Sequence, residues 1–299
     1  MIVNYTVHDT APYINWLYFF HAWGFQPKFS SIARLHGCDS CRAMWLTSFA
    51  EADRPKASEA MQLFKEAQRM LAELDSQYSI KGLVELLPAV SDGDDLLITA
   101  LDGSILTFPF LRQQTVKKED EPYVCLADFV RPKEKQQPDT LGVFATTTNI
   151  DVEAVAQDDP YKTMLVQTLA DRLAEAGTER MHEQVRKELW AYAPDESLSF
   201  EELLEEKYQG IRPAVGYPSM PDQSVNFLID ELLDMKRIGI SLTENGMMMP
   251  HASVSGLMFA HPRAEYFNIG KIGNDQLEDY ARRRGTSVET MRKFLAGNL

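Results

Sequence analysis

The 299-residue chain contains 44% hydrophobic and 25% charged residues, a composition typical of a globular protein with one large core or two modest ones. Its formal net charge of −14 argues against nucleic-acid binding, which needs concentrated Lys and Arg, but is compatible with a cationic ligand. No apolar stretch approaches the length of a membrane span, the N-terminus lacks a secretory signal, and three cysteines fit a reducing compartment. We therefore predict a cytoplasmic protein that does not enter the membrane.

Two cysteines stand close together near the N-terminus. In His36-Gly37-Cys38-Asp39-Ser40-Cys41, a CxxC pair and a nearby imidazole offer three of the four ligands that a structural zinc site usually has. No second pair completes such a site. Ordinary thiols in a loop are therefore favoured over metal or redox chemistry at Cys38 and Cys41.

Helix and strand patterns alternate irregularly along the first half of the chain. Between Lys56 and Asp75, apolar residues recur on one face at helical spacing, which predicts a surface helix packed on a core. Short apolar runs separated by glycine-containing turns then indicate an antiparallel meander. We expect strands at residues 83–90, 96–101, 105–110, 123–130 and 141–147.

Pro160 begins the longest helical pattern, which runs to about Trp190. Within it, Asp171 and Glu175 are four residues apart and hence stack on one face, with His182 two turns further along. Two carboxylates at this spacing repel each other, so they are either exposed to solvent or bind a cation. Helices with carboxylates and a histidine also bind metals, although a di-metal site would need a second such helix.

The last third again mixes helices with strands. A capping box at residues 199–202 predicts a short helix that ends at Gly210, and Asp222 can cap another. Further strands are expected at residues 240–242, 254–260 and 266–272, followed by helices at 274–285 and from 286 onward. Because strands and helices do not alternate strictly, the sequence predicts an α+β fold with mainly antiparallel strands.

The segment from Gln209 to Pro218 is predicted to be extended, because two prolines fix φ and remove backbone donors. Arg212 offers a planar fork for a carboxylate, Ala214 leaves its backbone accessible to a heterocycle, and Tyr217 offers a ring face for a cation or a base. A carboxylate, a cation and a purine together describe S-adenosylmethionine. The alternative is a Pro-rich connection without a ligand. No glycine-rich nucleotide loop is evident, so a site for this ligand must be built from extended backbone.

Seven motifs carry a resemblance to a known family. They closely resemble the C-terminal activation domain of cobalamin-dependent methionine synthase, and they cover nearly the whole chain in the family's order. The motifs are Leu111–Thr115, Cys125–Phe129, Leu169–Glu175, Ile211–Pro218, Leu242–Glu244, Ala252–Gly256 and Asp279–Arg283.

The resemblance implies a single C-shaped α+β domain over residues 1–299, with a twisted, mainly antiparallel sheet and flanking helices. Such domains bind S-adenosylmethionine in an outer groove. When the cobalamin held by a partner module has oxidised to cob(II)alamin, an electron from flavodoxin or an equivalent reductase and a methyl group from S-adenosylmethionine restore it. The expected partners are therefore the cobalamin-binding module of methionine synthase and a reductase.

The resemblance also implies site residues. Arg212 would pair with the ligand's carboxylate, Ala214 would contact adenine through its backbone, and Glu175 would lie beside the amino group. Asp171 would contact the cobalamin module rather than the ligand. The remaining positions expected at the groove are Asn15, Gly216, Tyr217, Tyr266 and Phe267.

Two departures from the family concern ligand affinity. Asn15 stands where the family carries Asp, so a neutral group replaces one charged partner of the ligand's ammonium. Phe267 stands where the family carries Tyr and lacks its hydroxyl. Because charge-assisted hydrogen bonds are stronger than neutral ones, the Asn15 difference predicts weaker binding.

The chain lacks a cobalamin lower-ligand signature and the substrate modules of a complete synthase, so we expect either a separate reactivation subunit or an excised domain. No residue is expected to act as a nucleophile. A basic cluster, Arg282, Arg283, Arg284, Arg292 and Lys293, is either a flavodoxin dock or a solvated helix end. Two other functions stay open: a regulatory module that binds S-adenosylmethionine without turnover, and a metal-dependent hydrolase that uses Asp171, Glu175 and His182.

Overall fold

The computed structural model describes residues 1–35, 37–114 and 121–299. Its main sheet has six strands in the order β4-β3-β2-β5-β8, with β1 paired to β2, and every pairing is antiparallel. The strands of this sheet are β1 (Ile2–Thr6), β2 (Ser79–Asp92), β3 (Asp95–Thr99), β4 (Ile105–Pro109), β5 (Asp139–Thr148) and β8 (Ser253–Met258); β6 (Ser241–Leu242) and β7 (Met248–Met249) form a separate hairpin.

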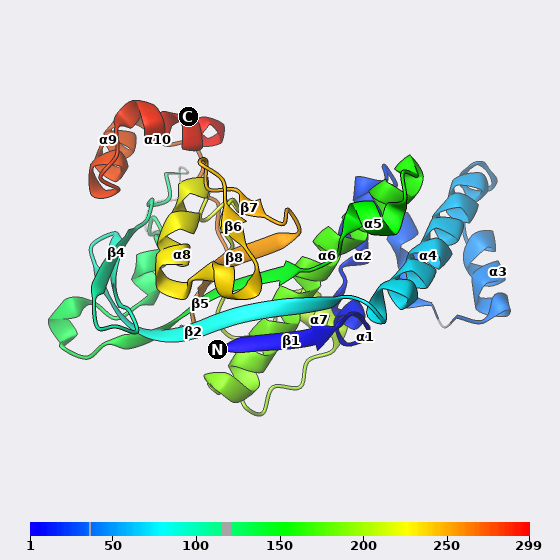
Figure 1. Cartoon of the computed structure of the whole chain (residues 1–299), viewed down its shortest axis with the longest axis horizontal. Coiled ribbons are helices and arrows are strands. Elements are labelled where there is room, and N and C mark those ends of the chain that lie inside the picture. The colour runs from blue at the N-terminus through cyan, green and yellow to red at the C-terminus, as the bar shows by residue number, and fades with distance from the viewer. Residues whose placement is uncertain (36, 115–120) are drawn as a thin grey trace.

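The helices cover both faces of this sheet and its two ends. Figure 1 shows α3 and α4 at one end of the long axis and α9 and α10 toward the other. The helices are α1 (Val7–Thr10), α2 (Trp16–Ala22), α3 (Asp39–Thr47), α4 (Arg54–Asp75), α5 (Val152–Ala156), α6 (Pro160–Gln184), α7 (Phe200–Leu204), α8 (Asn226–Leu233), α9 (Asn274–Arg283) and α10 (Val288–Phe294). The predicted α+β class with a mainly antiparallel sheet is confirmed.

Strand β2 organises the sheet, because its 14 residues pair with β5 along one edge and with both β1 and β3 along the other. Its side chains alternate between two cores, as the two-residue period of a strand requires. Ile80 and Val84 pack with residues of α2, α4 and α6, whereas Leu83 and Leu87 pack with residues of α8. Both faces of β2 are therefore buried.

Helix α6 lies directly on the sheet. Asp159 caps it by accepting the N–H groups of Tyr161 and Lys162, and Pro160 follows at a position that needs no backbone donor. A Cβ at Gly177 would overlap the Ile80 side chain, so glycine allows the helix to approach β2 closely. Next to it, the hydroxyls of Thr178 and Thr146 are hydrogen-bonded across the interface. This contact fixes the rotation of α6 about its axis and so determines which of its side chains face away from the sheet.

Two of the predicted strands are wrong. Residues 123–130 form a loop with a short 3-10 helix, Leu126–Phe129, because Asp128 accepts the Cys125 N–H and also pairs with Arg112. Residues 266–272 are irregular and bond to other loops: Ile269 donates its N–H to the Pro218 carbonyl. Most of the apolar side chains in the two segments are buried or half-buried, but no strand ladder forms.

The other predicted elements lie close to their expected positions, but the sequence predicted no helix at α1, α2, α3 or α5 and no strand at β7. The sequence predicted no strand at the N-terminus, where β1 lies, and the helix that begins after Ser199 ends at Leu204 instead of Gly210. In the described part of the chain, no helix combines the length and apolar character needed to cross a membrane.

Candidate functional site

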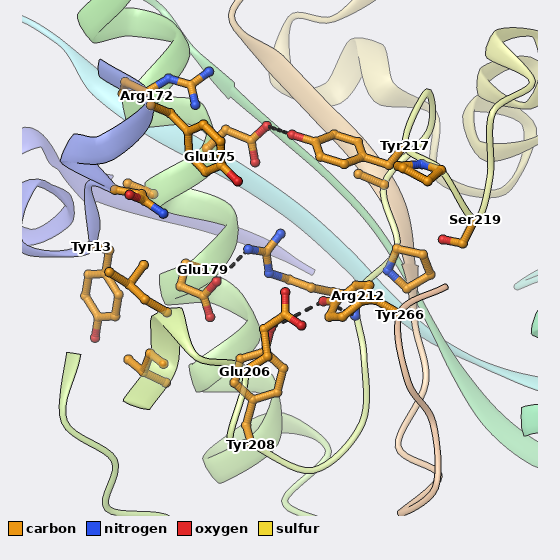
Figure 2. A pocket seen from close by; sticks show the side chains of 18 of the residues that line it. Tyr13, Arg172, Glu175, Glu179, Glu206, Tyr208, Arg212, Tyr217, Ser219 and Tyr266 are labelled. Carbon is orange, nitrogen blue, oxygen red and sulfur yellow. Dashed lines mark hydrogen bonds and ion pairs between the residues drawn. The ribbon is translucent and has the colours of Figure 1, made fainter. Parts of the chain in front are cut away.

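A cavity of about 550 Å³ lies between α6 and the extended segment that follows Ile211. Figure 2 shows the side chains of Glu175 and Glu179 pointing from α6 toward Arg212 and Tyr217 of that segment. The lining residues come from five separate parts of the chain: Tyr13, Asn15, Tyr18, Arg172, Glu175, Ala176, Glu179, Leu203, Leu204, Glu206, Tyr208, Arg212, Pro213, Ala214, Tyr217, Pro218, Ser219, Tyr266, Phe267 and Asn268.

The extended segment is held against β8 by backbone hydrogen bonds. The Pro213 carbonyl accepts the N–H of Leu257 at 3.1 Å, and the Val215 N–H donates to the Ser255 carbonyl at 2.9 Å. A Cβ at Gly256 would overlap the Pro213 carbonyl, so only glycine permits this approach. Because neighbouring residues of an extended chain point in opposite directions, the backbone of Ala214 faces away from β8.

Arg212 is fixed by a buried ion pair. Its Nη2 lies 2.5 Å from Glu179 Oε2, and the two side chains are only 17% and 9% exposed. Burial is the largest single influence and opposes the charge of Arg212, but Glu179, Tyr266, Tyr208 and Glu175 together outweigh it and raise the pKa of Arg212 well above its ordinary value. Two atoms of the pair, Arg212 Nε and Glu179 Oε1, are buried without a hydrogen-bond partner among the described residues.

Two tyrosines, Tyr266 and Tyr208, lie close to Arg212 (Figure 2). The Tyr266 hydroxyl accepts the backbone N–H of Arg212 at 3.0 Å and lies 3.3 Å from the Tyr208 hydroxyl. Burial raises the pKa of both Tyr266 and Tyr208, so both hydroxyls keep their protons near neutral pH. The backbone and the side chain of Arg212 are thus restrained separately.

The cavity is rich in carboxylates. Glu175, Glu179 and Glu206 line it, whereas its only lining cations among the described residues are Arg172 and Arg212. Burial raises the pKa of Glu206 above its ordinary value, with Arg212 acting in the opposite direction. The excess of carboxylates over guanidinium groups favours a ligand that carries positive charge.

Tyr217 closes one side of the cavity. Its hydroxyl donates to Glu175 Oε1 at 2.6 Å, which Figure 2 marks with a dashed line. Burial, followed by the charge of Glu175, raises the pKa of Tyr217, so the phenol stays protonated. The whole residue is nevertheless 49% exposed, which places it at the rim.

The structure brings seven of the eight predicted groove residues to this cavity: Asn15, Glu175, Arg212, Ala214, Tyr217, Tyr266 and Phe267. Gly216 does not line it. With φ of 87° and its N–H bonded to the Met220 carbonyl, Gly216 shapes the turn that presents Tyr217. Ligand contacts by the other seven stay a prediction.

Asn15 also has a structural role. Its Oδ1 accepts the Leu17 N–H at 3.1 Å and caps α2, which places the side chain at the cavity wall. Asp171 lies one turn before Glu175 on α6 but does not line the cavity. Its carboxylate accepts from Gln167 Nε2 at 3.0 Å and lies 3.5 Å from His251 Nδ1.

Sequence reasoning missed several lining residues, among them Glu179, Glu206 and Tyr208. Glu179 lies four residues after Glu175, which itself lies four residues after Asp171. The four-residue spacing of these acidic residues on one helix face was therefore a signal for Glu179. Glu206 and Tyr208 lie in an irregular segment after α7, where no periodic pattern distinguishes them. Only the tertiary fold brings that segment to Arg212.

The structure does not bring Asp171, Glu175 and His182 together as a metal site, since among the described residues no three His, Cys, Asp or Glu side chains come close enough to hold a metal ion. His182 is completely buried, and burial lowers its pKa well below the ordinary value. Its ring packs edge-on against Tyr208 at a centroid distance of 5.0 Å. The zinc interpretation of the CxxC motif includes His36, which lies outside the described residues.

The basic cluster near the C-terminus is only partly a surface feature. Arg283 pairs with Asp95 and Asp279, and Arg284 donates to Ser224, with side chains only 12% and 9% exposed. These two arginines join α9 to the rest of the fold. The exposed members of the cluster are Arg282, Arg292 and Lys293.

Comparison with known proteins gives matches that cover nearly the whole chain. The family model described as "Vitamin B12 dependent methionine synthase, activation domain" matches residues 6–285. Among solved structures, the chain is similar to the MetH reactivation domain in a crystal structure bound to AdoHcy, with 40% sequence identity and a TM-score of 0.87. That match covers 100% of this chain and 90% of the other.

Proposed function

Because the chain belongs to the family of vitamin B12-dependent methionine synthase activation domains, we propose that it binds S-adenosylmethionine in the cavity beside Arg212 and uses it to reactivate methionine synthase. The observation that carries this proposal is the largely buried Arg212 guanidinium beside a cavity with an excess of carboxylates. The 40% identical reactivation domain crystallised with AdoHcy, the demethylated form of this ligand, supports it. We further propose that residues 1–299 act as one domain.

The polar groups of the cavity match those of the ligand. Arg212 has a terminal nitrogen, Nη1, that makes no hydrogen bond among the described residues, and we assign it to the ligand's carboxylate. Glu175 and Glu206 would then face the ammonium and the sulfonium. The Ala214 N–H likewise makes no hydrogen bond within the described chain and can donate to a ring nitrogen of adenine.

The chain's part in the reaction is positioning. Arg212 and the carboxylates would hold the amino-acid end of the ligand while the half-exposed Tyr18 and Tyr217 mark the open rim through which the methyl group must leave. Cobalamin, held by a partner module, would supply the metal centre that accepts the methyl group. Asp171, outside the cavity on the same helix, is our candidate contact to that module.

An electron must come from a second partner, and we propose flavodoxin or an equivalent acidic reductase. Fewer basic side chains are available to such a partner than the sequence suggested, because Arg283 and Arg284 are largely buried and pair with groups of the fold. Exposed Arg282, Arg292 and Lys293 on α9 and α10 are the remaining candidates.

A label-transfer experiment tests the function directly. The chain is mixed with a cobalamin-loaded synthase fragment that lacks this domain, a reductant, and S-adenosylmethionine labelled on its methyl group. We expect label in the cobalamin fraction only when the chain is present, and loss of transfer in Arg212→Ala but not in the exposed Arg263→Ala. Binding without any transfer of label would instead identify a regulatory module.

A further inference from the structure

The Cys38–Cys41 pair lies at the start of α3. The prediction of a plain loop here is wrong: Cys38 is the N-cap residue, and its Sγ accepts the Cys41 N–H at 3.2 Å. The two Sγ atoms are 2.7 Å apart. Both residues are partly exposed, and Gly37, Asp39 and Ser40 around them are exposed. The pair is therefore accessible to small molecules.

We propose that Cys38 and Cys41 form a redox-active dithiol, which exchanges reversibly with a low-molecular-weight disulfide such as oxidised glutathione. Thiol–disulfide exchange needs an accessible sulfur and a second thiol within reach, and this geometry provides both. The inference rests on the α3 N-terminus alone and does not depend on the function proposed for the cavity.

The two sulfurs have different roles. Cys38 Sγ faces the N-terminus of a nine-residue helix, where backbone N–H groups and the helix dipole stabilise a thiolate. The hydrogen bond with Cys38, followed by burial, raises the pKa of the Cys41 thiol above its ordinary value. Cys38 is therefore assigned as the attacking sulfur and Cys41 as the thiol that resolves the intermediate.

The exchange balances in two steps. The Cys38 thiolate attacks one sulfur of oxidised glutathione, forming a mixed disulfide and releasing one glutathione thiolate, which takes up the proton lost by Cys38. Cys41 then loses its proton and attacks Cys38 Sγ, which forms the protein disulfide and releases the second glutathione as a thiol. The protein dithiol is oxidised by two electrons, and glutathione disulfide is reduced by the same number.

The third cysteine provides an internal control. Cys125 is completely buried, and burial raises its pKa to about 12. A buried, protonated thiol reacts slowly with disulfides and alkylating reagents. Cys125 should therefore react with an alkylating reagent only after the protein is denatured.

To test the inference, the reduced protein of residues 1–299 is equilibrated with glutathione mixtures of increasing oxidation. The mixtures are quenched with an alkylating reagent in denaturant, and the mass of the intact chain is measured by mass spectrometry. We expect oxidation to remove two alkylation sites together without adding glutathione, while Cys125 stays alkylated. Cys41→Ser should accumulate one glutathione on Cys38. Cys38→Ser should acquire glutathione more slowly, although both variants retain the circular dichroism of the parent chain.

Several results would overturn the inference. If the parent chain keeps all three alkylation sites in oxidised glutathione, the pair is not redox-active. If it carries bound glutathione but never loses the two sites together, the thiols act independently. If Cys38→Ser reacts as fast as Cys41→Ser, the assignment of Cys38 as the attacking sulfur is wrong.

Discussion

Glu179 is the residue on which the orientation of Arg212 depends, because it is the ion-pair partner of that guanidinium among the described residues. Removing one member of a buried pair leaves the other charge without compensation, which typically costs about 3–5 kcal/mol. We therefore expect Glu179→Gln to lower the free energy of unfolding by about 3 kcal/mol, as measured by urea denaturation.

The matched control is Glu188→Gln, which changes an exposed glutamate just beyond the end of the same helix. Surface substitutions of this kind usually change stability by less than about 0.5 kcal/mol. Equal stability losses in the two variants would mean that the Glu179–Arg212 pair does not hold the cavity together.

Glu206 should make ligand binding depend on pH. Its pKa is raised by burial above the ordinary value of 4.5, so it loses its charge at a higher pH than an exposed glutamate. Its charged form attracts the ligand's positive groups. Affinity for S-adenosylmethionine should therefore fall as the pH falls through this raised pKa. Near that pKa, binding should release protons, because the bound ligand favours the charged carboxylate. Calorimetry in buffers of different ionisation enthalpy measures both quantities.

Glu206→Gln supplies the comparison. The variant should bind more weakly at neutral pH and should lack the part of the pH dependence that Glu206 contributes. Identical pH profiles for the variant and the parent chain would remove Glu206 from the ligand's surroundings.

At the scale of elements, the cavity depends on how closely the extended segment approaches β8. A methyl group at residue 256 would overlap the Pro213 carbonyl, and overpacking of this kind costs about 1–3 kcal/mol. We expect Gly256→Ala to destabilise the protein by that amount and to weaken ligand binding, because Arg212 and Ala214 move with the segment. Denaturation and calorimetry measure the two effects.

Gly297→Ala is the control for this substitution, since no atom lies within 4 Å of the added methyl group and the residue is not in the left-handed region. A Gly256→Ala variant that matched Gly297→Ala in stability and affinity would show that the segment does not need its close contact with β8.

The elements also show what local sequence can and cannot predict. The extended form of residues 211–218 follows from Pro213 and Pro218, which act on their own backbone and need no tertiary contact. Strand formation at residues 266–272 depends on a partner strand. Their apolar pattern identified burial correctly but could not reveal that the neighbours are loops.

At the scale of the whole molecule, the antiparallel α+β fold is predictable because apolar residues recur along the sequence at the spacings typical of strands and helices. The cavity is predictable only in part. Residues in recognisable motifs, such as Arg212 and Glu175, can be assigned to a groove from the sequence. Glu206 and Tyr208 cannot, because an irregular segment carries no pattern and reaches the cavity only through tertiary packing.

The central claim is that this cavity binds S-adenosylmethionine through Arg212, and calorimetric titration of the chain with that ligand tests it most directly. The parent chain should bind one equivalent. Arg212→Ala should lose roughly 1.5–3 kcal/mol of binding free energy, because a charge-assisted hydrogen bond disappears. Arg292→Ala, an exposed arginine on α10, should bind like the parent chain. Unchanged affinity in a folded Arg212→Ala variant, or no binding by the parent chain, would contradict the account.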